Sequence, residues 1–469
     1  LNYDKDEIKD GDIIEMRFNG NADNGMYWEP MRVRSDKIKP QFFTVANNVW
    51  DTIQNPITNE MIQGGYKDFK NIENLEKKGE YYITNDDGLS ESYPLRKFHN
   101  YIKSKLITGI CSSFNKEIKV IDLSIGRGGD IKKYHNEDSN VSFILGIDIS
   151  SNYKEACQRF YYENKPKPKA VFIRGDTSKN IISSECSEFV DNDEYDKKHT
   201  EMMLSILYNK SLPLSNDYKD IHKNYKGLAK SGFDVMSSQF SMHYYFKTEE
   251  TFKSFIQNIK ENVIVNGYFI GTCYDGMKIF NHFNDIIIKN KKYMSNNDDI
   301  NDSNESNESN DSNEYNIEDT SERKLEFMDT TGNLIYSIER KYELDNFDYD
   351  PDNIQNMFGT EIDVYMDTIG QTFTEYLVNF DFFKEVMKQN GFELVIPQDI
   401  LSKHSNIFRK DYFEDGLGQF SKVIENIPEI KETDKEFQKY YSDAIGVTNN
   451  IFLKTLSSFN NYFIFQRTK

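Results

Sequence analysis

The stretch Asp122-Leu123-Ser124-Ile125-Gly126-Arg127-Gly128-Gly129-Asp130 decides the fold of this chain. It follows a short apolar run and precedes a segment with helical character. Glycines at such a turn let the backbone approach a ligand closely, and the amides at the start of the following helix can bind it. The glycines do not form the GxGxxG pattern of dinucleotide sites, so the turn favours a cofactor with a single adenosine over NAD.

Asp148 supports this interpretation because it ends the next apolar run, some 20 residues after Gly126. An acid at about that distance is expected to bind the ribose hydroxyls of a nucleoside. A plain structural turn in an α/β sheet is the alternative for the glycines alone. With Asp148 in place, the sequence predicts a nucleoside-type cofactor site.

Apolar runs and helical patterns alternate on both sides of the turn. Helices are predicted at residues 95–110 and 154–162, and strands at residues 119–123, 143–147, 170–173, 233–237, 268–272 and 334–338. This alternation is typical of an α/β domain with a parallel sheet. Ligands of such sheets bind beyond the carboxyl ends of the strands. Asp176 and Gln239 each follow a predicted strand, so both are expected to share a crevice with Gly126 and Asp148.

Other segments differ in composition. Residues 12–18 and 31–34 alternate apolar and polar side chains, which predicts two strands near the start of the chain. Residues 185–222 are polar and poorly periodic. Residues 295–320 contain the tract SNESNESNDSNE, whose few apolar side chains do not offset the entropy of ordering. We predict a disordered acidic insertion there, with an acidic interaction tail as the alternative.

Composition sets further limits. The formal net charge of -20 means that an RNA partner needs a local basic site or must be small. The four cysteines form no Cys-x-x-Cys pair, so neither a zinc site nor a disulfide framework is indicated, and no metal is predicted. No apolar run approaches the roughly 18 residues of a membrane helix, so no membrane association is expected. The chain begins at Leu1 without Met, which suggests a piece of a longer protein.

Five motifs between Tyr93 and Phe465 together resemble those of the eukaryotic and large-DNA-virus mRNA cap guanine-N7 methyltransferases. In order they are Arg96-Lys97-Phe98-His99-Asn100-Tyr101-Ile102-Lys103, the turn at Asp122–Ile131, Asp148, Gln239-Phe240 with His243-Tyr244, and Thr374-Glu375-Tyr376-Leu377-Val378. The resemblance implies a Rossmann-like class I methyltransferase fold with a seven-stranded, mostly parallel sheet. It also implies S-adenosyl-L-methionine as cofactor and the capped 5′ end of mRNA (GpppN) as substrate, methylated at guanine N7.

The same resemblance implies roles for individual residues. The cofactor would contact Lys103, Ser124, Gly126, Asp148, Asp176 and Gln239. The cap would contact His99, Arg127, Lys133, His243, Tyr244 and Glu375, with Arg127 and Lys133 facing its phosphates. No acid or base catalyst is implied, because guanine N7 carries a lone pair and no proton; His243, Tyr244 and Glu375 would position the base. Phe459 and Tyr462 are candidates for a late aromatic cap contact.

Four matched positions depart from the family pattern: His99, Ser124, Arg127 and Thr374 stand where the family has Asn, Gly, Lys and Pro. A non-catalytic interaction or regulatory module of a capping complex is therefore the alternative function, in which His99 and Ser124 mark a decayed site. Judged without the family, His243 is more simply a core histidine and Glu375 a solvated or capping helix residue.

The segment Trp28-Glu29-Pro30-Met31-Arg32-Val33-Arg34-Ser35-Asp36-Lys37 resembles the last conserved motif of mRNA guanylyltransferases, on their OB-fold. The nucleophilic Lys-x-Asp-Gly motif of those enzymes is absent, so guanylyltransfer is disfavoured. We predict a partial OB-fold-like segment at 1–65, a linker at 66–92 and a methyltransferase domain at 93–469. Implied partners are the triphosphatase and guanylyltransferase parts of a capping polypeptide and a stimulatory subunit, at a cytoplasmic location, viral factory or virion.

Overall fold

The computed structural model describes residues 8–18, 28–35, 37, 91–135, 140–162, 168–189, 193–211, 216–298, 322–329, 332–397 and 407–469. Internal contacts divide the chain into two compact units, Leu1–Glu76 and Lys77–Lys469. This division falls inside the predicted linker, which lies almost wholly outside the described residues, as does most of the predicted acidic insertion. The domain boundaries drawn from the sequence stay predictions.

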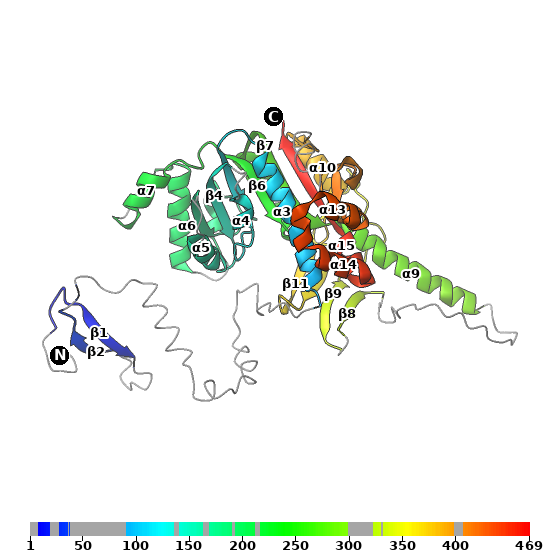
Figure 1. Ribbon diagram of the computed structural model, residues 1–469, viewed down its shortest axis with the longest axis horizontal. Coiled ribbons are helices and arrows are strands. Elements are labelled where there is room, and N and C mark those ends of the chain that lie inside the picture. Colours follow the sequence, from blue (N-terminus) through cyan, green and yellow to red (C-terminus); the bar gives the residue numbers. More distant parts are fainter. Residues whose placement is uncertain are drawn as a thin grey trace. The chain divides into compact units, whose positions relative to one another are not determined.

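A nine-stranded sheet forms the centre of the second unit (Figure 1). Its strands are β3 (Ile118–Asp122), β4 (Val141–Asp148), β5 (Lys169–Arg174), β6 (Phe233–Gln239), β7 (Val263–Tyr274), β12 (Phe392–Leu394), β13 (Phe413–Glu414), β14 (Leu417–Gln419) and β15 (Asn460–Arg467). The strand order is β13-β14-β15-β7-β6-β3-β4-β5, and β12 also pairs with β15. The five strands from β5 to β7 are mutually parallel, whereas β15 runs antiparallel to β7.

The sheet has nine strands rather than the predicted seven. The difference arises beyond β15, where separate short strands pair with the two ends of β15 in place of one continuous strand. β14 pairs with Asn461 and Tyr462 of β15, and β12 pairs with its other end at Phe465–Arg467. Two short strands thus take the place of one, and the two-residue β13 extends the edge. The α/β class and the parallel centre of the sheet are as predicted.

Helices cover the sheet, and their ends follow local sequence signals. They are α3 (Tyr93–Ser112), α4 (Ile131–Tyr134), α5 (Tyr153–Tyr162), α6 (Glu194–Leu207), α7 (Lys219–Tyr225), α8 (Glu249–Asn262), α9 (Gly276–Asp298), α10 (Phe380–Gln389), α12 (Phe420–Glu425), α13 (Ile427–Thr433), α14 (Tyr441–Asn449) and α15 (Ile451–Ser458). Pro94 stands in the first turn of α3, where no amide hydrogen bond is lost. A Thr248–Thr251 capping box starts α8.

The helix α6 was not predicted, because residues 185–222 read as polar and poorly periodic. Its buried apolar side chains gather in the last turns, from Met203 to Leu207. Asp193 caps it by accepting hydrogen bonds from the amides of Tyr195 and Asp196. α9 runs to Asp298, so its last turn overlaps the start of the predicted insertion.

A second, antiparallel sheet belongs to the same unit. It consists of β8 (Lys324–Met328), β9 (Leu334–Arg340), β10 (Glu361–Met366) and β11 (Gln371–Tyr376), in the order β11-β10-β9-β8. Of these strands only β9 was predicted from the sequence. β11 packs against the 3-10 helix η4 (Met242–Lys247), which follows β6. The second sheet therefore reaches the carboxyl end of the parallel strands.

The first unit contains a hairpin of β1 (Ile14–Phe18) and β2 (Trp28–Val33), close to the two predicted strands. Glu15 binds both Arg32 (2.9 Å) and Arg34 (3.1 Å), so these arginines pair across the hairpin. The remainder of an OB-fold falls outside the described residues. Within the described part of the chain, no helix is long and apolar enough to cross a membrane.

Candidate functional site

The glycine turn begins where β3 ends, and buried polar side chains fix its shape. Asp122 accepts hydrogen bonds from the Ser124 amide (3.1 Å) and the Tyr134 hydroxyl (2.7 Å). Gly128 has φ +77°, and a Cβ there would lie 2.9 Å from the Ala156 Cα on α5. Only glycine fits that position, because the turn packs directly on the helix backbone.

Asp148, at the end of β4, ties this turn to the neighbouring strand. Its Oδ2 accepts the Gly126 amide at 2.7 Å, and its Oδ1 accepts the amide and hydroxyl of Ser150. Gly126 has φ +51°, and a Cβ there would meet no atom within 4 Å. The turn therefore borders open space next to a buried carboxylate, whose Oδ2 retains capacity for a second donor.

Asp130, at the end of the turn, holds two lysines. Lys103 of α3 lies 3.0 Å from its Oδ1, and Lys133 of α4 binds the same oxygen. The two cations hold the pKa of Asp130 at about 2, against the opposing effect of burial. The Lys133 ammonium also donates to Asn100 Oδ1 (2.7 Å) and Gly129 O (3.1 Å).

This arrangement differs from the role predicted for Lys133. Its side chain is buried, and its three donors are directed at Asp130, Asn100 and the turn backbone rather than outward at phosphates. An ammonium in this position stabilises the turn. Arg127 is more exposed than Lys133 and lies 3.2 Å from Glu155 of α5.

Asp176 and Gln239 occupy the predicted strand ends. Asp176, after β5, is half-buried and accepts the Ser178 amide and hydroxyl through Oδ1. Gln239, the last residue of β6, is buried, donating to Ser237 Oγ (3.0 Å) and accepting from Thr272 Oγ1 (3.0 Å). The strands that these residues follow are parallel neighbours in the sheet, in the order β6-β3-β4-β5. Asp176, Gln239 and Asp148 therefore all lie at the carboxyl ends of the strands.

His243 and Glu375 meet at the same end of the sheet from different elements. His243 lies on η4, Glu375 on β11, and Nε2 of the imidazole is 3.4 Å from Oε1 of the carboxyl. Both side chains are buried, and among the described residues neither ring nitrogen of His243 has a hydrogen-bond partner. A buried unsatisfied nitrogen costs roughly 1–3 kcal/mol, so the arrangement is typical of a site that a ligand completes.

Burial shifts the protonation of both groups in opposite directions. It lowers the pKa of His243 to about 3 and raises the pKa of Glu375 to about 8. At neutral pH the imidazole is therefore uncharged and the carboxyl largely protonated. The simpler interpretation of Glu375 as a solvated helix residue is wrong, because Glu375 is buried on a strand.

Tyr244 and Tyr274 flank the histidine. The Tyr244 ring meets the imidazole edge-on, with 4.2 Å between the ring centroids. The Tyr274 ring stacks on the imidazole, with 5.1 Å between the centroids and 9° between the planes. The sequence reasoning placed Tyr244 in the site but missed Tyr274. Tyr274 could have been predicted, because it follows the strand predicted at 268–272 and the carboxyl end of that strand faces the crevice.

His99 belongs to a separate aromatic cluster. Its ring stacks on Phe240 (5.4 Å, 12°), meets Phe420 edge-on, and its Nε2 lies 3.1 Å from Ser457 Oγ. Phe240 has φ +52°, a left-handed conformation that costs a bulky residue about 1–3 kcal/mol. This strained residue directly follows Gln239 and carries the chain from β6 toward η4.

The two late aromatics are both buried. Tyr462 lies inside the sheet on β15, where its hydroxyl donates to the Ile407 carbonyl. This leaves no face of its ring for a base. Phe459 contacts His282 of α9 edge-on at 5.4 Å.

The residues at the turn fit an adenosine-containing cofactor. The open space at Gly126, the remaining acceptor capacity of Asp148 and the half-buried Asp176 are what ribose and adenine require. The described residues contain no group of three His, Cys, Asp or Glu side chains placed to hold a metal ion.

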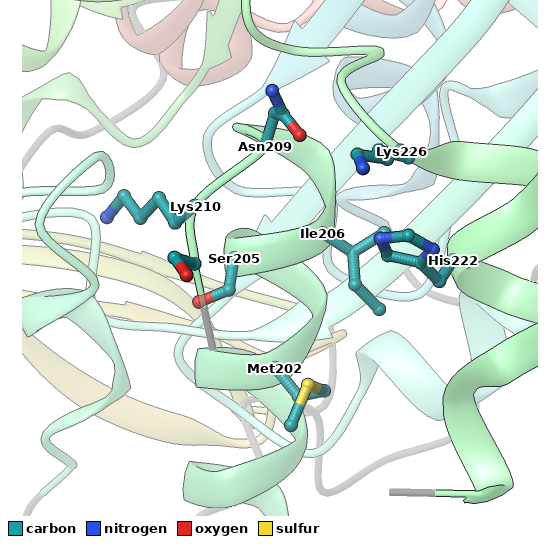
Figure 2. A pocket seen from close by; sticks show the side chains of 8 residues that line it. Met202, Ser205, Ile206, Asn209, Lys210, His222 and Lys226 are labelled. Carbon is teal, nitrogen blue, oxygen red and sulfur yellow. The ribbon is translucent and has the colours of Figure 1, made fainter. Parts of the chain in front are cut away.

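A cavity of about 280 Å³ lies elsewhere in the unit (Figure 2). Its lining includes Ser205 and Lys210 near the end of α6, and His222 and Lys226 at α7. The Lys169 ammonium, at the first residue of β5, donates to Asn224 O in α7. The cavity therefore lies toward the amino end of β5, away from the glycine turn, and no predicted site residue lines it.

Two family models match different parts of this chain. Residues 75–319, just over half of the chain, match a family model described as the mRNA (guanine-N(7))-methyltransferase domain. Residues 2–63 match one described as the mRNA capping enzyme, C-terminal domain.

Similar individual proteins come from a virus and from yeasts. A probable mRNA-capping enzyme of Acanthamoeba polyphaga mimivirus is 26% identical over 98% of this chain and 36% of that protein. An mRNA cap guanine-N(7) methyltransferase of Lodderomyces elongisporus is 30% identical over 39% of this chain and 30% of that protein. The chain thus spans about a third of the length of these relatives. Among solved structures, a putative S-adenosylmethionine dependent methyltransferase from Listeria monocytogenes covers 80% of this chain and 99% of its own at 10% identity, with a TM-score of 0.33.

Proposed function

Since this chain belongs to the mRNA (guanine-N7)-methyltransferase family, we propose that it transfers a methyl group from S-adenosyl-L-methionine to guanine N7 of the mRNA cap. The observation that carries the proposal is the meeting of two half-sites at one end of the parallel sheet. One is the turn at Gly126 with Asp148, and the other is the pair His243 and Glu375.

The cofactor half-site is built from strand ends. Asp148 Oδ2 accepts a ribose hydroxyl in addition to the Gly126 amide, and Asp176 binds the adenine amino group through its second carboxylate oxygen. Lys103, held by Asp130, faces the methionine portion. Gln239 and Ser124 line the pocket. Bound S-adenosyl-L-methionine supplies an electrophilic methyl group on a sulfonium centre.

The guanine half-site reads the edge of the base opposite N7. Ionised Glu375 accepts hydrogen bonds from the N1–H and the 2-amino group. His243, uncharged, supplies a hydrogen bond through a nitrogen that otherwise has none, and the Tyr244 ring bounds the base. Guanine N7 has a lone pair and no proton, so no general base is required.

Catalysis is then a matter of position and charge. Holding N7 in line with the methyl group removes the entropic cost of alignment. Positive charge develops on the guanine as the methyl transfers, and the Glu375 carboxylate stabilises it from the far edge in a site of low dielectric. His99 lies in a separate aromatic cluster, and Lys133 shares Asp130 with Lys103. We propose for both a supporting role around the site.

The test is a methyl-transfer assay with GpppG and with capped RNA, using ApppA, which contains no guanine, as the specificity control. We expect N7 methylation of GpppG and of GpppA-ended RNA, and no product with ApppA. Binding of S-adenosylhomocysteine without any methyl transfer would favour the alternative, a non-catalytic module of a capping complex.

The match of residues 2–63 to the capping enzyme C-terminal domain supports a second proposal. The chain is part of a multifunctional capping polypeptide whose triphosphatase and guanylyltransferase parts precede it, acting in the cytoplasm or a viral factory, with a stimulatory subunit as a further proposed partner. Without the nucleophilic lysine motif, this chain should form no covalent GMP adduct with labelled GTP. A labelled band at 55 kDa would contradict that.

A further inference from the structure

Tyr274 joins the parts of the guanine half-site. It is the last residue of β7. Its ring stacks on His243, and its hydroxyl donates to the Tyr376 carbonyl at 3.2 Å. The hydroxyl also lowers the pKa of the Glu375 carboxyl, although burial raises that pKa more strongly. Burial keeps the hydroxyl protonated, because the pKa of Tyr274 lies well above its usual range. The hydroxyl therefore keeps its single proton, while its oxygen can still accept a hydrogen bond.

His243 depends on this stacking more than most buried histidines do. A buried histidine is ordinarily oriented by a hydrogen bond to one ring nitrogen, yet among the described residues neither nitrogen of His243 has such a partner. The plane of the imidazole is fixed instead by its near-parallel contact with Tyr274, by the edge of Tyr244 and by the 3.4 Å approach of Glu375.

Glu375 depends on Tyr274 in another way. β11, which carries Glu375, pairs in the antiparallel sheet, whereas Tyr274 belongs to the parallel sheet. The bond from the Tyr274 hydroxyl to Tyr376 O anchors the end of β11 one residue from Glu375. Side chains from two sheets thus keep a fixed separation because one tyrosine contacts both.

We propose that Tyr274 is a positioning residue for cap recognition, which sets the plane of His243 through its ring and the place of Glu375 through its hydroxyl. The inference rests on the proposed function. It assigns to Tyr274 an effect on the guanine half-site and none on the cofactor half-site, which is formed by the ends of β3, β4, β5 and β6.

Two substitutions separate the two contacts. Tyr274→Phe keeps the ring and removes the donor; Tyr274→Leu removes the aromatic face as well. We expect Tyr274→Phe to raise KM for GpppG by about threefold to tenfold, the equivalent of one net hydrogen bond, with kcat changed less. Tyr274→Leu should raise KM further and also lower kcat. S-adenosylhomocysteine affinity should be unchanged in both.

The pH profile distinguishes positioning from a general loss of structure. The titratable groups facing Glu375 are His243, Cys273, Tyr274 and Tyr336, and all are uncharged at neutral pH, because burial lowers the pKa of the histidine and raises the pKa of the others. The decrease of kcat/KM on the acidic side of the pH profile is therefore caused by protonation of Glu375. The Tyr274 hydroxyl lowers the pKa of Glu375, so Tyr274→Phe should move this decrease to higher pH.

Tyr268→Phe is the matched control, since Tyr268 lies on the same strand toward its other end and accepts a bond from Gln466. It should retain wild-type kinetics. Unchanged KM and pH profile in Tyr274→Phe would overturn the inference, as would a parallel loss of S-adenosylhomocysteine affinity. A wild-type protein that does not methylate GpppG would instead overturn the proposed function.

Discussion

Nε2 of His243 lies 3.4 Å from Oε1 of Glu375, and burial leaves the first group uncharged and the second largely protonated at neutral pH. If Glu375 must be ionised to accept two guanine donors, cap binding requires the loss of its proton. Because the pKa of Glu375 is about 8, we expect kcat/KM for GpppG to rise with pH through that value and to level off about one pH unit above it. S-adenosylhomocysteine affinity, measured calorimetrically, should stay flat over that range. A flat kcat/KM profile would show that Glu375 does not bind the base as a carboxylate.

Glu375→Gln should weaken cap binding while the fold is retained. The amide accepts less strongly and brings a donor toward the guanine donors, so the loss should approach the roughly 1.5–3 kcal/mol of a charge-assisted hydrogen bond. Stability gives a second readout. The pKa of Glu375 is raised in the folded state from 4.5 to about 8, so the contribution of Glu375 to stability is fully present below pH 4.5 and is lost as the pH rises through that window. The Gln variant should lack this decline in thermal unfolding. Wild-type GpppG affinity in the variant would contradict the assignment.

Asp148 carries two functions that substitution can separate. Asp148→Ala should abolish detectable cofactor binding, because it removes charge-assisted bonds worth roughly 1.5–3 kcal/mol each and releases the Gly126 amide from Oδ2. Asp148→Asn retains one acceptor for that amide and should lose cofactor affinity with a smaller change in melting temperature. Calorimetry with S-adenosylhomocysteine checks both, and unchanged affinity in Asp148→Ala would refute the ribose role.

Lys133→Met tests the buried lysine at the glycine turn. Removing one of the two cations on Asp130 should destabilise the fold by up to about 3 kcal/mol and weaken S-adenosylhomocysteine binding, because Asp130 also holds Lys103. KM for GpppG at saturating cofactor should change little. Arg127→Met is the comparison, since Arg127 is more exposed and remains the proposed phosphate contact. A selective rise in cap KM for Lys133→Met would restore the phosphate role predicted from the sequence.

Deletion of residues 296–320 should leave methyl transfer nearly unchanged. Loop closure depends weakly on length, at about 0.6 kcal/mol for each doubling, and the predicted site residues all lie outside this segment. Steady-state kinetics and a melting curve of the deletion variant are the measurements. Lost activity with an intact melting transition would reveal a role for the acidic tract.

The parallel strands and the places of Asp148 and Gln239 at the ends of two of them were predictable, because apolar runs followed by a polar residue report local structure directly. The helix α6 was not, since its buried side chains lie mainly in its last turns and its start depends on a cap at Asp193. Nor was the burial of Glu375 or Lys133. Both depend on partners distant in sequence: Glu375 on His243 and Tyr274, and Lys133 on Asn100 of α3. Only family motifs, not periodicity, pointed to these residues.

The short strands that pair with the outer side of β15 influence how the protein behaves at high concentration. A long exposed edge strand is a template for pairing with another molecule, and short strands blunt it. β12, β13 and β14 are each at most three residues long. Along the described residues, the edge of the sheet beyond β15 therefore offers only short ladders to a second copy. Intermolecular strand addition at that edge, the first step toward fibrous aggregates, is disfavoured.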